Sequence, residues 1–196
     1  MRVKKIFVIL TTIVILGVIT YSIYQRGCMI PKEWLSFESR NKAFDFTFKY
    51  PPDWKPQETK GRTEEYDQAN MFGPRDKERK FTLAYGITVQ SVGEESAADL
   101  LNQYVKYLAN ASQFKMISKK NVKIGGRSFP GVRIQYLLRL PIYQINAKDV
   151  LMEEETYVII NGKHSYRMNL LGTKEQVRKY YPVFKGMLKT FRFKNQ

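Results

Sequence analysis

The chain of 196 residues is 43% hydrophobic and 26% charged, and its formal net charge is +15. This composition supplies the core of one domain and excludes an intrinsically disordered chain. The excess of positive charge indicates one of two things. Either the chain has an anionic partner, such as lipid headgroups, an acidic wall polymer or an acidic protein, or its surface is simply basic and soluble.

An apolar segment follows the basic N-terminus. Residues 6–24, IFVILTTIVILGVITYSIY, contain no charge, and as a helix they would span about 28 Å of a bilayer core of about 30 Å. Because basic flanks stay in the cytoplasm, we predict a single-pass cell membrane protein. It has a cytoplasmic flank at residues 1–5, a transmembrane signal anchor at 6–24 and an extracytoplasmic remainder. The alternative is a cleaved signal peptide, whose apolar region is usually shorter, about 7–15 residues.

Residues 25–42 are predicted to form a linker. The linker contains Cys28, the only cysteine of the chain, so no internal disulfide can form. Lipidation of Cys28 is a weak alternative, because Arg26 does not fit the small or aliphatic run that precedes such a site. We expect Trp34 and Phe37 to pack either at the membrane interface or on the domain.

The first strand of the domain, which we place at residues 43–196, is expected in the stretch FDFTFKYPPDW. Its alternation puts four aromatic side chains on one buried face: Phe44, Phe46, Phe48 and Tyr50. Two prolines end the strand because they cannot donate ladder hydrogen bonds. Trp54 is then expected to fold back over the edge of the core.

Further strands are predicted by alternating apolar residues at 81–89, 132–140, 150–160 and 164–170. The dipeptide Asn161-Gly162 predicts a hairpin between the last two. Gly125-Gly126 similarly joins 114–124 to 127–140. Between residues 51 and 80 the signal is weaker, with a polar, turn-rich stretch followed by a short edge strand and a charged loop.

Two capping boxes predict helices. Ser96 with Asp99 begins the first helix, and Thr173 with Gln176 begins the second. Pro182 lies inside the second helix and is expected to kink or restart it. The order of strands and helices predicts the α+β class, an antiparallel β-sheet flanked by helices.

Four stretches together resemble the PsbP-like domain and its bacterial relatives. They are FDFTFKYPPDW, NMFGPRD, SAADLLNQYVKYL and YYPVFKGMLKTFRF. The resemblance covers about residues 43–193, and it extends to the broader fold of the Ran-binding Mog-type proteins and the envelope protein DcrB. Its specificity lies in the order of the elements and in the Tyr-Pro-x-x-Trp turn.

The resemblance implies a PsbP-like α/β/α sandwich with a non-catalytic accessory role. For the photosynthetic branch it implies docking onto photosystem II, with effects on calcium and chloride retention. The chain departs from that branch in its predicted anchor and in its single histidine, so a histidine-based metal site does not carry over. Nothing in the sequence implies a photosynthetic host.

Candidate chemistry is sparse. In a strand, Glu153 and Glu155 would point the same way about 6.6 Å apart, a spacing that occurs in inverting glycosidases. We favour a cross-strand charge pattern with Arg133 and Arg139, with weak cation binding and an envelope glycan or ester hydrolase as alternatives. His164 is expected to be structural or exposed, since it has no nucleophile to activate. The chain holds too few histidines and cysteines for a zinc site, and we predict no catalytic residue and no cofactor.

The basic tracts are the candidate binding surface. Their residues are Arg75, Lys77, Arg79, Lys80, Lys119, Lys120, Lys123 and Arg127. Lys119 and Lys120 should leave a strand on opposite faces. Nucleic acid is not an expected partner, because the aromatic residues line core faces. The sequence therefore predicts a membrane-tethered accessory domain whose basic surface contacts a partner protein or an anionic envelope component.

Overall fold

The computed structural model describes residues 33–39, 44–60, 66–77, 81–124, 127–138 and 149–194. The predicted flank at 1–5, the predicted anchor at 6–24 and Cys28 lie outside these ranges, as do Arg79, Lys80 and Arg139. Neither helix within the described ranges has the length and apolarity that are needed to cross a bilayer.

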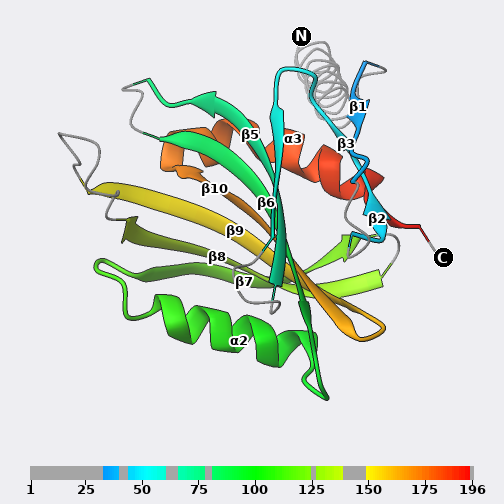
Figure 1. Ribbon diagram of the computed structural model, residues 1–196. Coiled ribbons are helices and arrows are strands. Elements are labelled where there is room, and N and C mark those ends of the chain that lie inside the picture. The colour runs from blue at the N-terminus through cyan, green and yellow to red at the C-terminus, as the bar shows by residue number, and fades with distance from the viewer. Residues whose placement is uncertain are drawn as a thin grey trace, which may run out of the picture. The chain divides into compact units, whose positions relative to one another are not determined.

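Seven antiparallel strands form the main sheet, in the spatial order β4-β5-β6-β10-β9-β8-β7 (Figure 1). Their bounds are β4 Lys55–Lys60, β5 Tyr66–Arg75, β6 Thr82–Ser91, β7 Lys115–Ile124, β8 Arg127–Leu138, β9 Val150–Asn161 and β10 His164–Thr173. Strands neighbouring in sequence are mostly neighbours in the sheet. The exception is the pairing of β10 with β6, which joins β4-β5-β6 to β10-β9-β8-β7. The α+β prediction is confirmed.

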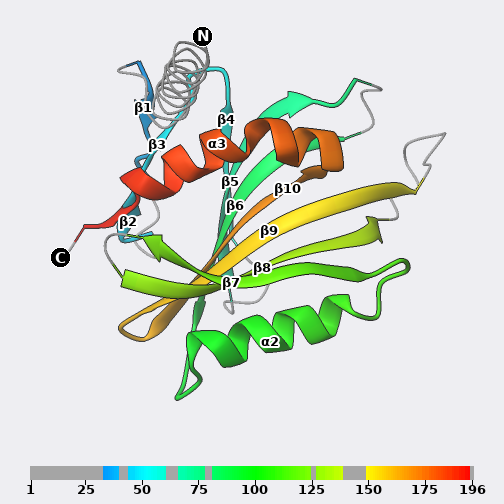
Figure 2. The same ribbon diagram turned by 180° about the vertical axis from the view of Figure 1, so that it is seen from behind.

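Two helices cover opposite faces of this sheet, as Figures 1 and 2 show: α2 (Ala97–Leu108) and α3 (Lys174–Thr190). Both predicted capping boxes are confirmed, because Ser96 and Thr173 each accept a hydrogen bond from the backbone of the third helical residue. The helix α3 continues through Pro182 as a single element, so the expected restart does not occur. Phe184, Met187 and Leu188 are buried beyond the proline and hold that part of the helix on the sheet.

The two faces of the sheet carry separate hydrophobic clusters. Residues such as Leu83, Tyr85, Ile87, Met168 and Phe184 fill the side that faces α3. Residues such as Leu101, Val132, Ile134, Met152 and Val158 fill the side that faces α2. Alternation along each central strand therefore supplies both layers of the core, as expected for a sheet with helices on both faces.

The aromatic face of the opening stretch is buried as predicted. The exposed fractions of its four side chains lie between 0% and 7%. The stretch is not, however, the first strand of the main sheet. It forms β2 (Phe46–Thr47), paired with β11 (Arg192–Phe193), and β3 (Lys49–Tyr50), paired with β1 (Leu35–Ser36).

One edge of the main sheet is instead β4, in the polar stretch that we expected to be turn-rich. The exchange has a physical cause. A strand with one wholly aromatic face gains more by closing the open end of the α3-side core, where its rings meet those of Tyr85, Tyr166 and Phe191, than by occupying a solvated edge. The edge position suits β4, which contains Pro56 and mostly exposed side chains.

The core also draws on residues 33–39, in the predicted linker. Phe37 is 3% exposed and stacks on Phe46 and Phe48, at ring-centre distances of 5.8 and 5.0 Å. The packed unit therefore begins ahead of residue 43. Trp54 is also 3% exposed and lies edge-on to Tyr180, which confirms that it folds back over the core.

Both predicted hairpins are confirmed by strand pairing. His164 pairs with Asn161 across a two-residue turn in which Gly162 has φ +58°, a conformation that glycine adopts without strain. Ile124 pairs with Arg127 at the end of the β7–β8 ladder. These two hairpins bring their turns to the same end of the sheet, because β8 and β9 are antiparallel neighbours.

Candidate binding surface

Three consecutive glutamates in the central strand β9 are all buried. Glu153 is 3% exposed, and Glu154 and Glu155 are 0% exposed. Because side chains alternate across a strand, Glu153 and Glu155 lie on the face covered by α3 and Glu154 lies on the face covered by α2. Each side of the sheet therefore holds carboxyl groups that need polar partners.

On the α3 side, one cation from β8 and one from β7 neutralise the pair. Arg133 Nη2 lies 2.7 Å from Glu153 Oε2, and Lys120 Nζ lies 3.1 Å from Glu155 Oε1. Tyr157 donates to the same Glu155 oxygen at 2.5 Å. The predicted cross-strand charge pattern is thus confirmed for Arg133. Burial would lower the pKa of Lys120, but its hydrogen bond to Glu155 and the charge of Glu155 outweigh burial and raise it.

A hydrolytic or cation-binding role for Glu153 and Glu155 finds no open site. Both carboxyl groups are covered and engaged by protein donors, so no room remains for a glycan and an attacking water. Within the described ranges, no group of three or more His, Cys, Asp or Glu stands close enough to hold a metal ion. His164 is exposed at the start of β10, as predicted.

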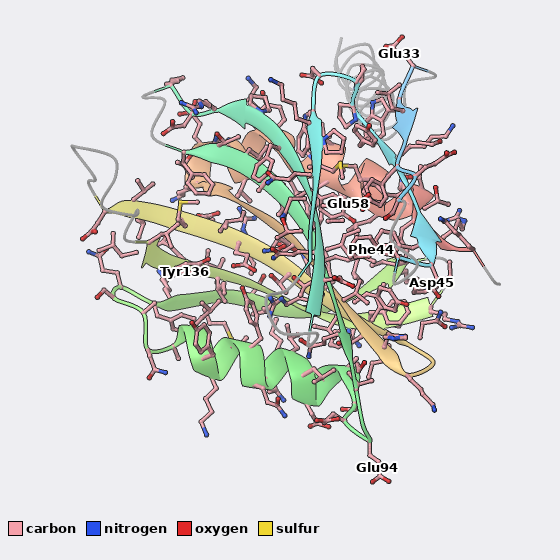
Figure 3. The ribbon with its side chains drawn as sticks, in the orientation of Figure 1. Glu33, Phe44, Asp45, Glu58, Glu94 and Tyr136 are labelled. Carbon is pink, nitrogen blue, oxygen red and sulfur yellow. The ribbon has the colours of Figure 1, made fainter. Side chains whose placement is uncertain are left out.

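On the α2 side, Glu154 accepts hydrogen bonds from four neutral groups. Tyr104 donates to Oε1 at 2.8 Å, Asn169 Nδ2 donates to it at 3.1 Å, and Thr156 also donates to it. Tyr136 donates to Oε2 at 2.9 Å. Figure 3 shows Tyr136 between the sheet and α2. We name these five residues the Glu154 cage, and its donors come from one helix and three strands.

Five tyrosines, four buried and one half-buried (Tyr104), have raised pKa values: Tyr85, Tyr104, Tyr136, Tyr157 and Tyr166. Burial is the largest cause for each of them. The charge of Glu154 adds to it at Tyr104 and Tyr136, the charge of Glu155 adds to it at Tyr157, and a hydrogen bond to Asp45 adds to it at Tyr166. These phenols stay protonated in the folded chain well above the pH at which free tyrosine ionises.

We expect an alkaline titration of the full-length chain to show two classes of tyrosine. The phenol of free tyrosine ionises near pH 10, whereas the five phenols with raised pKa values ionise only when the domain unfolds. Because their folded pKa values lie above the unfolded value of 10.0, their contribution to stability is complete below pH 10 and is lost as the pH rises beyond it. Ultraviolet difference spectra measure phenolate, and circular dichroism measures the fold. Ionisation of all thirteen tyrosines near pH 10 in a folded chain would contradict the expectation.

The predicted basic residues do not form one patch. Arg75 is the last residue of β5 and Lys77 follows it, and Lys77 Nζ pairs with Glu175 at 2.8 Å. Lys119 and Lys120 do leave β7 on opposite faces: Lys119 bonds to Asn102 of α2, and Lys120 bonds to Tyr181 of α3. The strands β5 and β7 are separated by four others in the sheet, so the two tracts serve different surfaces.

The helix α3 is a further basic element, which the predicted binding surface did not include. It carries five cations and one acid, Glu175; the cations are Lys174, Arg178, Lys179, Lys185 and Lys189. All five except the half-buried Lys185 are exposed. The helix α2 has a single Lys106 balanced by Asp99, so the two helices differ in charge. The sequence did contain a signal for this basic surface. The basic residues of 174–190 lie between the apolar ones, and such positions of an amphipathic helix face solvent.

A cleft of about 340 Å³ opens on the same side of the sheet. Arg127 and Arg192 line it together with an apolar floor, formed by Ile124, Phe129, Ile159, Phe191 and Phe193. Arg192 Nη1 donates to the carbonyl oxygens of Lys189 and Phe191 at 2.8 and 2.6 Å. These hydrogen bonds hold the guanidinium group at the rim of the cleft. We name this feature the basic cleft. Two guanidinium groups above aromatic and aliphatic side chains suit a ligand that has both an anionic and an apolar part.

The architecture is that of the PsbP-like domain. A seven-stranded sheet between two helices is shared with the solved structures below, and at identities of 10% to 14% the likeness shows the fold alone. No protein-family model and no curated protein sequence matches the chain.

Three solved structures illustrate the likeness. Cyanobacterial PsbP from Synechocystis sp. PCC 6803 has a TM-score of 0.56 and 14% identity, over 84% of this chain and 95% of that protein. LpqN of Mycobacterium tuberculosis, described as involved in cell envelope biogenesis, has a TM-score of 0.52 and 12% identity, over 82% and 91%. The Ran-binding protein Mog1p of Saccharomyces cerevisiae has a TM-score of 0.50 and 10% identity, over 83% and 96%.

Proposed function

We propose that the chain is a non-catalytic binding domain, held at the outer face of a membrane by residues 6–24, that receives an anionic partner on its α3 side. The observation that carries this proposal is the basic cleft, which lies at the C-terminal end of the basic helix α3. Charge on one face steers an oppositely charged partner and orients it. The aromatic floor beneath Arg127 and Arg192 adds apolar contact at the point of capture.

A binding role also suits the buried carboxyl groups better than a hydrolytic one. An acid that donates a proton and a base that activates water must both reach the substrate. Glu153 and Glu155 are covered, and their partners are protein side chains. The named neighbours are consistent with binding: one binds Ran, and one takes part in building a cell envelope. We extend the envelope setting to this chain because of its predicted anchor.

The proposal predicts that charge reversal at the basic cleft removes binding. The full-length chain, in detergent, is titrated with poly-glutamate and with polyphosphate, which present carboxylates and phosphates respectively. We expect Arg127→Glu with Arg192→Glu to weaken binding of the preferred polymer by about tenfold or more, with the wild-type affinity falling as salt rises. Isothermal calorimetry at low and moderate salt measures both effects.

The matched control reverses the same amount of charge elsewhere. Lys55 lies on the far sheet edge and Lys106 lies on α2, and both are exposed. The variant Lys55→Glu with Lys106→Glu should bind nearly as the wild type does. Equal weakening by both double variants would show that net charge, and not the basic cleft, governs binding. No binding of either polymer at low salt would remove the proposal.

A further inference from the structure

The strand β7 is an open edge of the main sheet. It pairs with β8 on one side, and in the described part of the chain no other strand and no loop backbone bonds to its second side. An unpaired edge presents a row of N–H and C=O groups that can template another strand. At ten residues, β7 is long enough for such pairing.

The edge is strongly basic. Of its ten residues, four are lysines and none is acidic; the lysines are Lys115, Lys119, Lys120 and Lys123. Two copies of β7 placed side by side would set lysine against lysine, which is unfavourable. The charge therefore works against pairing of the chain with itself and favours an acidic strand.

A bulge divides β7 into two parts. The register shifts between Met116 and Ser118, which leaves Ile117 without a partner in β8. Bulges twist an edge and interrupt regular pairing, so the regular part is residues 118–124. In this part the residue pairs run without a break, from Ser118 with Arg133 to Ile124 with Arg127.

Residues 118–124 have two different faces. Lys119, Asn121 and Lys123 lie on the α2 side, where Lys119 Nζ bonds to Asn102. Ser118, Lys120, Val122 and Ile124 lie on the α3 side. There Lys120 Nζ is paired with Glu155, and Val122 and Ile124 lie opposite Phe129 and Arg127 of β8. Because Ile124, Arg127 and Phe129 also line the basic cleft, the α3-side face of the edge leads directly into it.

We infer that residues 118–124 of β7 accept an extended acidic segment of a partner protein as an added strand. The inference rests on the proposed function and names the chemistry of its partner. Acidic side chains of the added strand lie beside Lys119 and Lys123, about 13 Å apart along β7, and apolar side chains lie beside Val122 and Ile124. Main-chain hydrogen bonds supply the affinity, and the two faces select a sequence that alternates acidic and apolar residues. One end of the segment reaches Arg127 and Arg192.

The probe is an acetylated and amidated peptide of alternating glutamate and valine, with the length of residues 118–124 and a fluorescent label. We expect it to bind the full-length chain in detergent, and to slow hydrogen exchange of the β7 amides. The peptide of alternating lysine and valine should bind at least about tenfold more weakly. Fluorescence anisotropy gives the affinities, and exchange mass spectrometry locates the protection.

Two N-methylated peptides separate strand pairing from simple charge attraction. One is methylated at the glutamate nitrogens and the other at the valine nitrogens, so both keep the charge. Since only one alternate set of amides can face β7, one of the two peptides should lose about tenfold or more in affinity. Equal affinity of all three acidic peptides would overturn the inference.

Variants of the chain complete the test. Lys119→Glu with Lys123→Glu should weaken the acidic peptide by about tenfold or more, whereas Lys49→Glu with Lys55→Glu, at exposed positions outside β7, should not. If poly-glutamate binds through Arg127 and Arg192 but the strand peptide is insensitive to Lys119 and Lys123, the inference fails and the proposed function stands. If neither the peptides nor poly-glutamate nor polyphosphate binds, the proposed function fails as well.

Discussion

Replacing Glu154 by alanine is expected to destabilise the domain by about 3–5 kcal/mol. The carboxyl group is the shared acceptor of Tyr104, Tyr136, Thr156 and Asn169. Its removal leaves several buried donors without a partner and opens a cavity at the same time. A loss of this size lowers the melting temperature by about 10 °C in a domain of this length.

The conservative variant Glu154→Gln separates acceptor loss from cavity formation. Its carbonyl oxygen and its amide still pair with hydroxyl groups, so we expect a loss of about 1–2 kcal/mol. Urea unfolding followed by tryptophan fluorescence measures both variants, since the only tryptophans, Trp34 and Trp54, lie in the domain. Glu94→Ala is the control, because Glu94 is exposed beyond β6 (Figure 3). A loss under about 1 kcal/mol for Glu154→Ala would contradict a structural role for the Glu154 cage.

The second large effect is expected at Phe46, the centre of the aromatic cluster that closes the core. Its side chain is fully buried, and it meets five other rings at centre distances from 5.3 to 6.1 Å; these belong to Phe37, Phe44, Phe48, Tyr166 and Phe191. Truncation to alanine should cost about 3–5 kcal/mol. Because Phe46 lies in β2, which pairs with β11, amides of residues 191–194 should exchange faster.

Tyr107→Ala is the matched control for this truncation. The Tyr107 side chain is 74% exposed, so the loss of an aromatic ring there should change the free energy of unfolding by less than about 0.5 kcal/mol. Phe46→Leu keeps an apolar side chain in the cluster and should fall between the two. If Phe46→Ala and Tyr107→Ala proved equally mild, the aromatic cluster would not be the closing element of the core.

Local signals in the sequence determined much of the fold. Alternation assigned the buried face of residues 44–50. The two capping boxes placed the starts of α2 and α3, and Asn161-Gly162 marked the β9–β10 turn. Each of these features depends on residues that are near one another in the chain, and for that reason a single sequence was sufficient to find them.

Which strands pair with one another depends instead on residues that are distant in the chain. The sequence could not show that the aromatic stretch leaves the main sheet, because its partners are Leu35 and Phe193 at the two ends of the domain. Nor could it show that the polar residues 55–60 form an edge strand. A solvated edge strand tolerates many kinds of residue, because its side chains pack against little else. The composition of residues 55–60 therefore gives almost no indication of a strand.

The features of the candidate site likewise fall into two groups: some follow from the local sequence, and others depend on the tertiary structure. The sequence by itself determined the basic charge, the opposite faces of Lys119 and Lys120, and the pairing of Glu153 with Arg133. Only the tertiary structure decided that all three glutamates are buried, since the donors of the Glu154 cage come from α2, β8, β9 and β10. The tertiary structure also forms the basic cleft, because it brings together residues near 124–129, 159 and 191–193. Segments so far apart in the chain meet only when the core is packed, because burial of apolar surface, and not local propensity, brings them together.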